Sequence, residues 1–464
     1  MLKKIFVTTL LLCIVLTIGC TPTVNLNTQP ESQTAQTTDS SSSDKNQQTN
    51  FQKIKAEILT AYPASFNDGS KNKLNEDFLS WLETAYGNNI LSEVHTLLTS
   101  GNFQQKSWHT LTGNTFTVLY DMFRGALDPE SSNYQPNIRQ MNHSMDSETI
   151  LNFVGDVSLA DNWRIMPYYD SRSKGVSGIL SERIIAEMRG ADIMLANNEF
   201  TFSDRGQALE KQYTFRAAPY RVSIYQDLGV DIVSLANNHA YDYGTDAFLD
   251  TMETLFNANI PYIGGGKNIE EAMRPYYFIV NGRKIAYVAA TRAEKYIITP
   301  EAGESTPGVL RTYDSELFLK TIQEAKQNSD YVIAYVHWGT EESNEIEDVQ
   351  RTMGYEYIDA GADIVIGAHA HVLQGMEFYK GKPIVYNLGN FLFNAITTDT
   401  GMLKIHISSD GALSYEFLPC IQKDCYTADV DGSEKERILN FMQNISFDVS
   451  FDENGYFSPA SEGN

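Results

Sequence analysis

Five short motifs in this 464-residue sequence combine carboxylate, amide and imidazole side chains. Each motif follows an apolar, β-branched run that is typical of a strand. The motifs are Gly155-Asp156, Asn197-Asn198-Glu199, Asn237-Asn238-His239, His337-Trp338-Gly339 and Gly367-Ala368-His369-Ala370-His371. Four of the eight histidines of the chain lie in them. A single histidine at a strand end is more often a hydrogen-bonded structural residue than a ligand, but five such motifs together indicate one site.

The residue types in these motifs suit metal ions. Imidazole and carboxylate ligands together favour Zn²⁺, Mn²⁺ or Fe over the all-oxygen site that Ca²⁺ prefers. One carboxylate can bridge two ions about 3.5–4 Å apart, as in many phosphatases. His369 and His371 would point to opposite faces of an extended strand. The small residues Gly367, Ala368 and Ala370 permit a turn that brings both rings to one site. We therefore expect one or two divalent ions.

The elements that must position these motifs alternate between strands and helices. Strand-like runs lie at 150–154, 193–195, 230–235, 331–336 and 363–366, and a hairpin is expected around Asn281-Gly282. Helical stretches lie near 177–189, 244–258, 313–328 and 345–360. This alternation predicts an α/β domain with much of its sheet parallel. Open α/β sheets bind ligands beyond the carboxyl ends of their strands, which is where the five motifs fall.

An N-terminal helical region precedes this domain. Residues 51–126 show helical spacing of apolar side chains, interrupted by proline and glycine, which predicts several short helices. Residues 127–147 are interpreted as a linker, so that 51–147 form an accessory region.

The first twenty residues have the features of a signal peptide. Lys3 and Lys4 precede an apolar stretch, 5–18, that is too short for a membrane span. The stretch ends in Leu16-Thr17-Ile18-Gly19-Cys20, which resembles the lipobox of bacterial lipoproteins, although Thr17 stands where that motif usually has Leu. This resemblance implies a membrane lipid on Cys20 and a lipid-anchored protein on the extracytoplasmic face of the cell membrane. The alternative is an ordinary secretory signal that is cut near Gly19. The polar residues 21–50 are expected to form a flexible tether.

The charge of the chain excludes some partners. It has 35 basic and 59 acidic residues, which give a formal net charge of −24. This balance argues against sequence-independent binding of nucleic acid and against attachment to anionic lipid by charge alone. A polyanionic ligand would need a local basic pocket.

Two cysteines lie near the C-terminus, Cys420 and Cys425. In an oxidising exterior, a local disulfide is favoured over two free thiols. A metal knuckle would need further Cys or His residues nearby, and none follows in the sequence.

In their order along the chain, the five motifs resemble those of the CapA/PgsA family of poly-γ-glutamate capsule synthesis proteins. The resemblance includes Asp242-Tyr243-Gly244 and the segment 386–391, and it covers about 148–408. The family is similar to the calcineurin-like metallophosphoesterases, which implies a metallophosphatase-like two-layer β-sandwich flanked by helices. The helical region and a C-terminal extension, 409–464, lie outside the resemblance.

Carried over residue by residue, the resemblance implies a set of metal ligands. Asp156 and His371 would hold the first metal, Glu199 would bridge, and Asn238, His337 and His369 would hold the second. His239 matches the histidine that polarises the reacting group, and His239 and Asp156 are the candidate catalytic residues. The Asp-x-His opening of the phosphatases is here Asp156-Val157-Ser158, so one imidazole ligand is missing, and Glu199 replaces the usual bridging Asp. We therefore expect the first metal to bind weakly.

Three basic residues follow the core motifs and are candidates for holding an anionic substrate: Lys211, Arg216 and Arg292. The alternative for each is an ordinary surface position.

Three functions remain open. The first is a surface lipoprotein that acts in synthesis, export or anchoring of an anionic poly-γ-glutamate-like polymer, with a metal-assisted hydrolytic or transfer step. The second is a metallophosphoesterase-like hydrolase of another envelope substrate. The third is a non-catalytic binding module with a relict metal site. Because the sequence has no Walker-type Gly-Lys-Ser/Thr loop, ATP-coupled ligation of a polymer would need membrane synthase subunits as partners.

Overall fold

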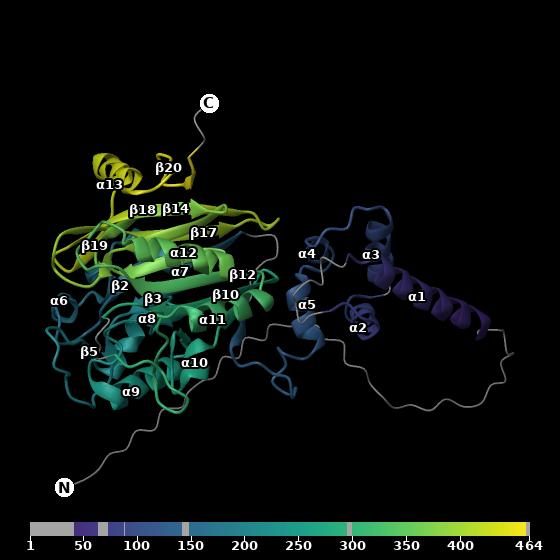
Figure 1. Cartoon of the computed structure of the whole chain (residues 1–464), viewed down its shortest axis with the longest axis horizontal. Coiled ribbons are helices and arrows are strands. Elements are labelled where there is room, and N and C mark those ends of the chain that lie inside the picture. The colour runs from purple at the N-terminus through teal and green to yellow at the C-terminus, as the bar shows by residue number, and fades with distance from the viewer. Residues whose placement is uncertain (1–40, 64–72, 88, 142–147, 295–298, 461–464) are drawn as a thin grey trace, which may run out of the picture. The chain divides into compact units, whose positions relative to one another are not determined.

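The computed structural model describes residues 41–63, 73–87, 89–141, 148–294 and 299–460 (Figure 1). The expected signal peptide, Cys20 and most of the expected tether lie outside the described residues. The chain divides into two compact units, 1–52 and 53–464. Helix α1 (Ser41–Ala61) begins in the first unit. Because the expected tether ended at residue 50, its last ten residues, 41–50, are helical. None of the helices in the described ranges has the length and apolar character that crossing a bilayer requires.

Four further helices form the predicted N-terminal helical region, which is confirmed: α2 (Glu76–Tyr86), α3 (Asn89–Thr99), α4 (Ser107–Thr112) and α5 (Phe116–Phe123). The side chain of Asn75 caps α2 by accepting a hydrogen bond from the Phe78 backbone N–H at 2.8 Å. Phe78, Trp108 and Phe116 are buried in the aromatic core that these helices share. A buried ion pair of 2.5 Å between Asp121 of α5 and Lys284 ties the region to the following domain.

That domain contains two mixed β-sheets. The seven-stranded sheet has the order β1 (Ile138–Gln140), β9 (Tyr276–Val280), β10 (Arg283–Thr291), β12 (Tyr331–Trp338), β13 (Ile364–His369), β15 (Lys382–Leu388) and β14 (Leu373–Tyr379). The eight-stranded sheet has the order β19 (Tyr426–Asp429), β18 (Leu413–Lys423), β17 (Thr398–Ile407), β2 (Thr149–Val157), β3 (Ile193–Asn198), β6 (Ile232–Ser234) and β7 (Tyr262–Ile263), and β16 (Asn390–Leu392) pairs with β2.

The two sheets pack face to face. Alternation along β2 sends Phe153 toward the other sheet, where its ring centroid lies 6.2 Å from that of Tyr287. Leu195 and Ile366 belong to the same core between the sheets. Val154, the next residue after Phe153, faces the helices on the outer side instead. The fold is therefore a two-layer sandwich.

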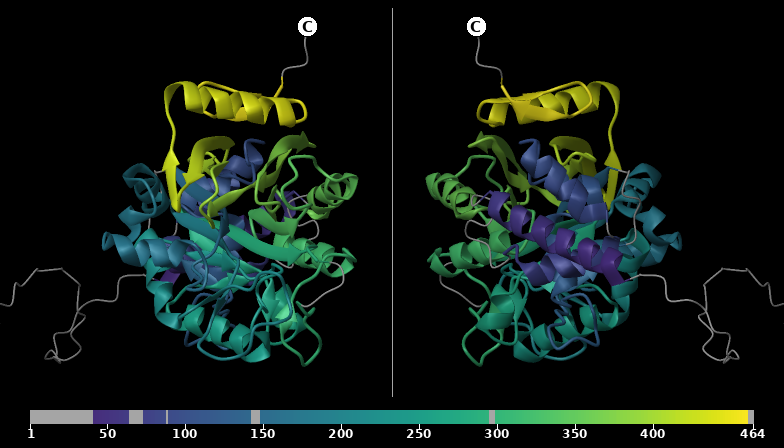
Figure 2. Two further views of the ribbon diagram at one scale, coloured as in Figure 1. Left: turned by 90° about the vertical axis from the view of Figure 1, so that its left-hand side faces the viewer. Right: turned by 90° about the vertical axis from the view of Figure 1, so that its right-hand side faces the viewer.

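Helices cover both outer faces (Figures 1 and 2). The outer face of the eight-stranded sheet is covered by α6 (Ile165–Arg172), α7 (Glu182–Gly190), α8 (Val222–Leu228) and α9 (Gly244–Asn257). The outer face of the other sheet is covered by α10 (Ile269–Met273), α11 (Glu316–Gln327) and α12 (Asp348–Ala360). Helix α13 (Gly432–Ile445), yellow in Figure 2, adds Ile438, Leu439 and Met442 to the core between the sheets. The predicted two-layer β-sandwich flanked by helices is confirmed.

The five predicted strands correspond to β2, β3, β6, β12 and β13, and their pairing is parallel within each sheet, as expected. The predicted hairpin joins β9 and β10, with Asn281 and Gly282 at φ +47° and +70°. The eight-stranded sheet continues past residue 408, because residues 413–422 of β18 pair with β17.

The expected disulfide between Cys420 and Cys425 is wrong, because both thiols are free. Cys420 lies inside β18, opposite Asp429 of β19, and its side chain is buried in the core beneath the helices. Cys425 lies in the tight turn between these strands, at φ +64°, and its Sγ contacts the backbone oxygen of Arg164 at 3.5 Å. The pairing of β18 with β19 and the turn between these strands therefore place the two sulfur atoms against different neighbours.

Candidate metal centre

The carboxyl ends of strands from both sheets carry the five motifs. β2, β3 and β6 are adjacent and parallel in one sheet, and β12 and β13 are adjacent and parallel in the other. Because parallel neighbours end at the same edge, each sheet presents its motifs together. The two sheets present them to one buried site.

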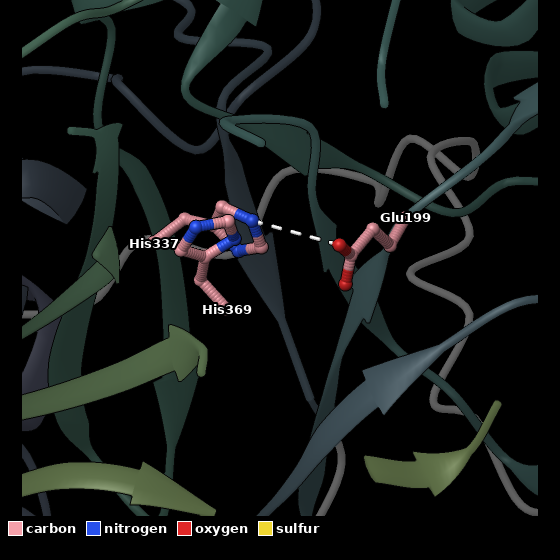
Figure 3. A group of neighbouring side chains, drawn as sticks. All are labelled: Glu199, His337 and His369. Carbon is pink, nitrogen blue, oxygen red and sulfur yellow. Dashed lines mark ion pairs between the residues drawn. The ribbon is translucent and has the colours of Figure 1, made fainter. Parts of the chain in front are cut away.

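Glu199, His337 and His369 form one cluster of ligand-type side chains (Figure 3). Their ligand atoms all lie within 4.8 Å of one another. The Nε2 atom of His337 lies 3.6 Å from Oε1 of Glu199, and the ring centroids of His337 and His369 are 4.6 Å apart. Asn238 adjoins this cluster, since its Oδ1 accepts a hydrogen bond of 2.8 Å from His337 Nε2.

Asp156, Glu199 and His371 form a second cluster of the same kind. Nδ1 of His371 lies 3.1 Å from Oδ2 of Asp156, and Nε2 of the same ring lies 3.9 Å from Oε1 of Glu199. Glu199 therefore belongs to both clusters. This is the position that the resemblance implied for a bridging carboxylate.

A turn in the backbone directs both histidines of the His-x-His motif into the site. His369 and His371 adopt φ angles of +97° and +60°, which non-glycine residues rarely do. The His369 backbone N–H donates to Oδ2 of Asp156 at 3.2 Å, which helps to hold this conformation. Gly367 has no room for a side chain, because a Cβ would lie 1.9 Å from the backbone oxygen of Tyr386. The small residues of this motif thus permit the close packing that the turn requires.

The carboxylates of the site are completely buried. Burial and then the neighbouring charge of Asp156 hold the pKa of Glu199 well above its usual value. Burial also opposes ionisation of Asp156, but the hydrogen bond and charge of His371 outweigh it and lower the pKa of Asp156. Two acids this close together in the interior favour a cation between them.

The imidazoles of the first cluster are held in the neutral form that binds metals. Burial, followed by the charge of His371, lowers the pKa of His369 to about 3. Burial, followed by the neighbouring histidines, lowers the pKa of His337 well below its usual value. Burial also lowers the pKa of His371, but the bond to Asp156 prevails and the net pKa is raised.

Two buried atoms of the ligand clusters have no hydrogen-bond partner among the described residues, Oε1 of Glu199 and Nδ1 of His369. Leaving such a group unsatisfied costs about 1–3 kcal/mol. Both atoms belong to the ligand clusters, so a bound divalent ion would satisfy them. The donor set of carboxylates, imidazoles and one amide oxygen therefore fits one or two transition-metal ions.

Asn197 is a site residue to which the sequence analysis assigned no role. Its Nδ2 lies 2.8 Å from Oδ1 of Asp156 and 3.1 Å from Oε2 of Glu199, and its Oδ1 accepts from Asn237 at 3.1 Å. Asn197 lies two residues before Glu199, which directly follows β3. This spacing was the available signal, because side chains two residues apart on an extended segment point to the same face.

His239 lies beside the clusters, and Asp242 orients it. Nδ1 of His239 lies 2.7 Å from Oδ2 of Asp242, which also accepts from the backbone N–H of Phe215 at 2.8 Å. Nζ of Lys211 lies 3.1 Å from Oδ1 of the same carboxylate. The ring of Phe215 packs 4.5 Å from that of His239. Asp242 belongs to the Asp242-Tyr243-Gly244 motif of the sequence, but its role becomes clear only from the position of the His239 ring beside it.

The three basic candidates surround the site in different ways. Lys211 is buried, and its ammonium group contacts Asp242, the backbone oxygen of Asn238 and Glu294. Arg216 stacks on the ring of Tyr243 at 4.2 Å. The backbone N–H of Arg292 bonds the backbone oxygen of His337 at 2.8 Å, which places this residue beside a cluster ligand. Binding of an anionic substrate by these residues stays a prediction.

The profile of the family described as bacterial capsule synthesis protein PGA_cap matches residues 150–395. The chain is 32% identical over 273 residues to the PGA biosynthesis protein CapA of Bacillus subtilis (strain 168), which covers 58% of this chain and 70% of that protein. It is also 32% identical over 220 residues to the capsule biosynthesis protein CapA of Bacillus anthracis, covering 46% of this chain and 53% of that protein.

Among solved structures, the NAD nucleotidase NadN of Haemophilus influenzae matches with a TM-score of 0.36 and 12% identity, over 66% of this chain and 64% of that one. The 5'-nucleotidase of Candida albicans SC5314 matches with a TM-score of 0.33 and 14% identity, over 60% of this chain and 53% of that one.

Proposed function

This chain belongs to the PGA_cap family of bacterial capsule synthesis proteins, and on that premise we propose that it acts in the biosynthesis of a poly-γ-glutamate-like capsule polymer. The protein carries out a metal-assisted hydrolytic or transfer step on that polymer, at the two buried ligand clusters beyond the strand ends. The names of the two Bacillus relatives support the polymer, and the geometry of the cluster supports the metal.

One observation carries the catalytic part of the proposal. Glu199 is shared by the two ligand clusters. Its Oε1 lies 3.6 Å from Nε2 of His337 and 3.9 Å from Nε2 of His371, and it has no hydrogen-bond partner among the described residues. A purely structural carboxylate would be expected to have hydrogen-bond partners for both oxygens when it is completely buried.

The residues of the chain divide into metal holders and proton carriers. Asp156, Glu199 and His371 would hold one ion, and Glu199, Asn238, His337 and His369 would hold the other. When bound, these ions supply Lewis acidity to the reacting group.

His239 supplies the proton transfer. Asp242 accepts from Nδ1, which fixes the tautomer and leaves Nε2 to take up or release a proton. Lys211 and the Phe215 backbone N–H hold the Asp242 carboxylate in place, so the imidazole is oriented before substrate binds. General acid–base catalysis of this kind typically contributes about 10²–10⁴-fold to the rate.

The location at the cell surface is part of the proposal. The leader 1–20, the Gly19-Cys20 pair and the polar segment after it support a lipid anchor on Cys20. Anchored in this way, the protein would meet the polymer outside the cell, while membrane synthase subunits would carry out the ATP-coupled ligation.

A chain-length assay tests the proposal. The purified protein is loaded with Mn²⁺, Zn²⁺ or Fe²⁺ and incubated with poly-γ-glutamate, and the polymer length distribution is followed with and without EDTA. We expect a metal-dependent change in length that His239→Gln abolishes although the variant keeps its metal. A metal-loaded wild-type protein that leaves the polymer unchanged, in a strain whose capsule yield also does not depend on His239, would contradict the catalytic role.

A further inference from the structure

An open cleft of about 600 Å³ lies away from the ligand clusters, between the α6 region and the hairpin of β18 and β19. Arg172 and Lys174 line one wall, and Lys423 and Asp424 line the other. The two walls are fixed to each other by backbone hydrogen bonds of 3.0 Å from Ser181 to Thr427 and 2.9 Å from Thr427 to Ile179. The hairpin lies outside 150–395, the residues that match the family profile.

The charge of this cleft is opposite to that of the chain. Three of its side chains are basic and one is acidic, although the whole chain has a formal net charge of −24. Within the described ranges, no acidic side chain lies within ion-pair distance, 4.0 Å, of Arg172, Lys174 or Lys423. All three bases are exposed to solvent. The cleft therefore presents positive charge that the described acidic side chains do not pair with.

Aromatic rings lie among these cations. Tyr168 and Tyr426 line the cleft, and the guanidinium carbon of Arg172 lies 4.4 Å from the centroid of the Tyr168 ring, with a hydrogen bond to its hydroxyl. This contact orders the guanidinium group at the cleft. The lining of the cleft thus combines apolar ring faces with the guanidinium group that Tyr168 holds and with the ammonium groups of two lysines.

A short segment connects the cleft with the metal centre. Gln422, next to Lys423, accepts hydrogen bonds from the backbone N–H groups of Phe393 at 2.8 Å and Asn394 at 3.1 Å. The ring of Phe393 lies 4.6 Å from that of His371, and Asn390 Oδ1 accepts from His371 Nδ1 at 2.8 Å. Residues 390–394 therefore border the metal centre and also support the wall of the cleft.

We propose that this cleft binds a polycarboxylate chain and serves as a second, non-catalytic subsite for the anionic polymer. The identity of the polymer rests on the proposed function, whereas the charge and shape of the cleft do not. A γ-glutamyl repeat carries one carboxylate and two methylene groups. The carboxylates meet the guanidinium and ammonium groups, and the methylenes pack on the two tyrosine rings. The cleft would hold the chain while another part of it lies at the metal centre.

Binding is measured with the purified full-length protein in detergent, with labelled poly-γ-glutamate as the probe and EDTA present so that the metal centre is silent. We expect Lys174→Gln/Lys423→Gln to weaken binding by roughly 5- to 30-fold, because two exposed charge contacts are lost. The matched control, Lys267→Gln/Lys320→Gln, removes two exposed lysines elsewhere and should bind as the wild type does. Lys174→Arg/Lys423→Arg should keep the affinity. Binding of the wild type should also weaken as salt is added.

The outcomes separate the cleft from the metal centre. His369→Ala, which removes a metal ligand, should bind the probe as the wild type does. Equal binding by the wild type and the Lys174→Gln/Lys423→Gln variant, or no binding by the wild type, overturns the cleft proposal and leaves the metal-dependent step untouched. Polyphosphate that competes as well as unlabelled poly-γ-glutamate would show a general anion site and overturn the polycarboxylate assignment. Cleft-dependent binding without any metal-dependent change of the polymer would leave the cleft and remove the catalytic role.

Discussion

Nδ1 of His239 lies 2.7 Å from Oδ2 of Asp242, three residues further along the chain, and both side chains are buried beside the ligand clusters. Asp242 also contacts Lys211 through its other oxygen. A buried histidine paired with an anchored carboxylate is arranged to transfer a proton in a defined direction. Metal binding by the ligand clusters would not by itself require the pairing of His239 with Asp242.

Replacing this carboxylate with an amide should therefore reduce turnover more than folding. In Asp242→Asn the His239 tautomer is no longer fixed, and we expect the metal-dependent activity on the polymer to fall by about 10²–10³-fold. Metal content should stay close to that of the wild type, because Asp242 is not in either cluster. The exposed Asp246→Asn serves as the matched control. Retained activity in a folded Asp242→Asn protein would show that His239 needs no orientation.

The sequence predicted that the five motifs lie together, because each motif ends a parallel strand and parallel strands end at one edge of a sheet. The same local reasoning could not assign Asn197, since its contacts join Asp156 on β2 with Glu199, which directly follows β3. Lys211 shows a second limit. A lysine after the core motifs suggests a substrate contact, but only the packed structure shows that three internal acceptors already engage its ammonium group.

The C-terminal strands were missed for a related reason. β18 has buried residues next to one another near Cys420, not a clean alternation, because helices cover one face of its sheet and the other sheet covers the opposite face. The disulfide prediction failed at the same place, since sequence separation alone cannot tell that the strand partner of Cys420 is Asp429.

The ion pair between Lys284 and Asp121 should be important for stability, because both side chains are almost completely buried. Lys284→Met leaves the Asp121 carboxylate in the interior with Arg124 as its remaining partner. We expect a loss of about 3 kcal/mol in the free energy of unfolding. Chemical denaturation measures it. The double variant Lys284→Met/Asp121→Leu should recover part of the loss, and a single variant as stable as the wild type would contradict the prediction.

His406 should stabilise the protein at low pH. Its hydrogen bond to Glu416 raises its pKa, burial opposes this, and Glu148 adds to the increase, while Lys404 on the same strand acts against it. Because the folded-state pKa is raised, the contribution is fully present below the unfolded value of about 6.5 and is lost as the pH rises through the folded value.

The test compares His406→Gln with the wild type by denaturant unfolding. We expect a loss of about 1–2 kcal/mol near pH 5.5 and a smaller loss near pH 8. The control is His95→Gln in the N-terminal helical region, because Glu57, the ion-pair partner of His95, is half exposed. A loss that grows with pH would have the wrong sign for a charged His406 between two carboxylates.

We propose that the two ligand clusters at the strand ends form a metal centre built around the shared Glu199. The metal content per chain is the decisive measurement. Wild-type protein, loaded with Mn²⁺, Zn²⁺ or Fe²⁺ and dialysed, is analysed for bound metal beside His369→Ala and Glu199→Gln. Because His369 belongs to one cluster and Glu199 to both, we expect His369→Ala to lose the metal of one site and Glu199→Gln to lose the metal of both. Wild-type protein that retains none of these ions, or folded Glu199→Gln that retains as much as the wild type, would contradict the account.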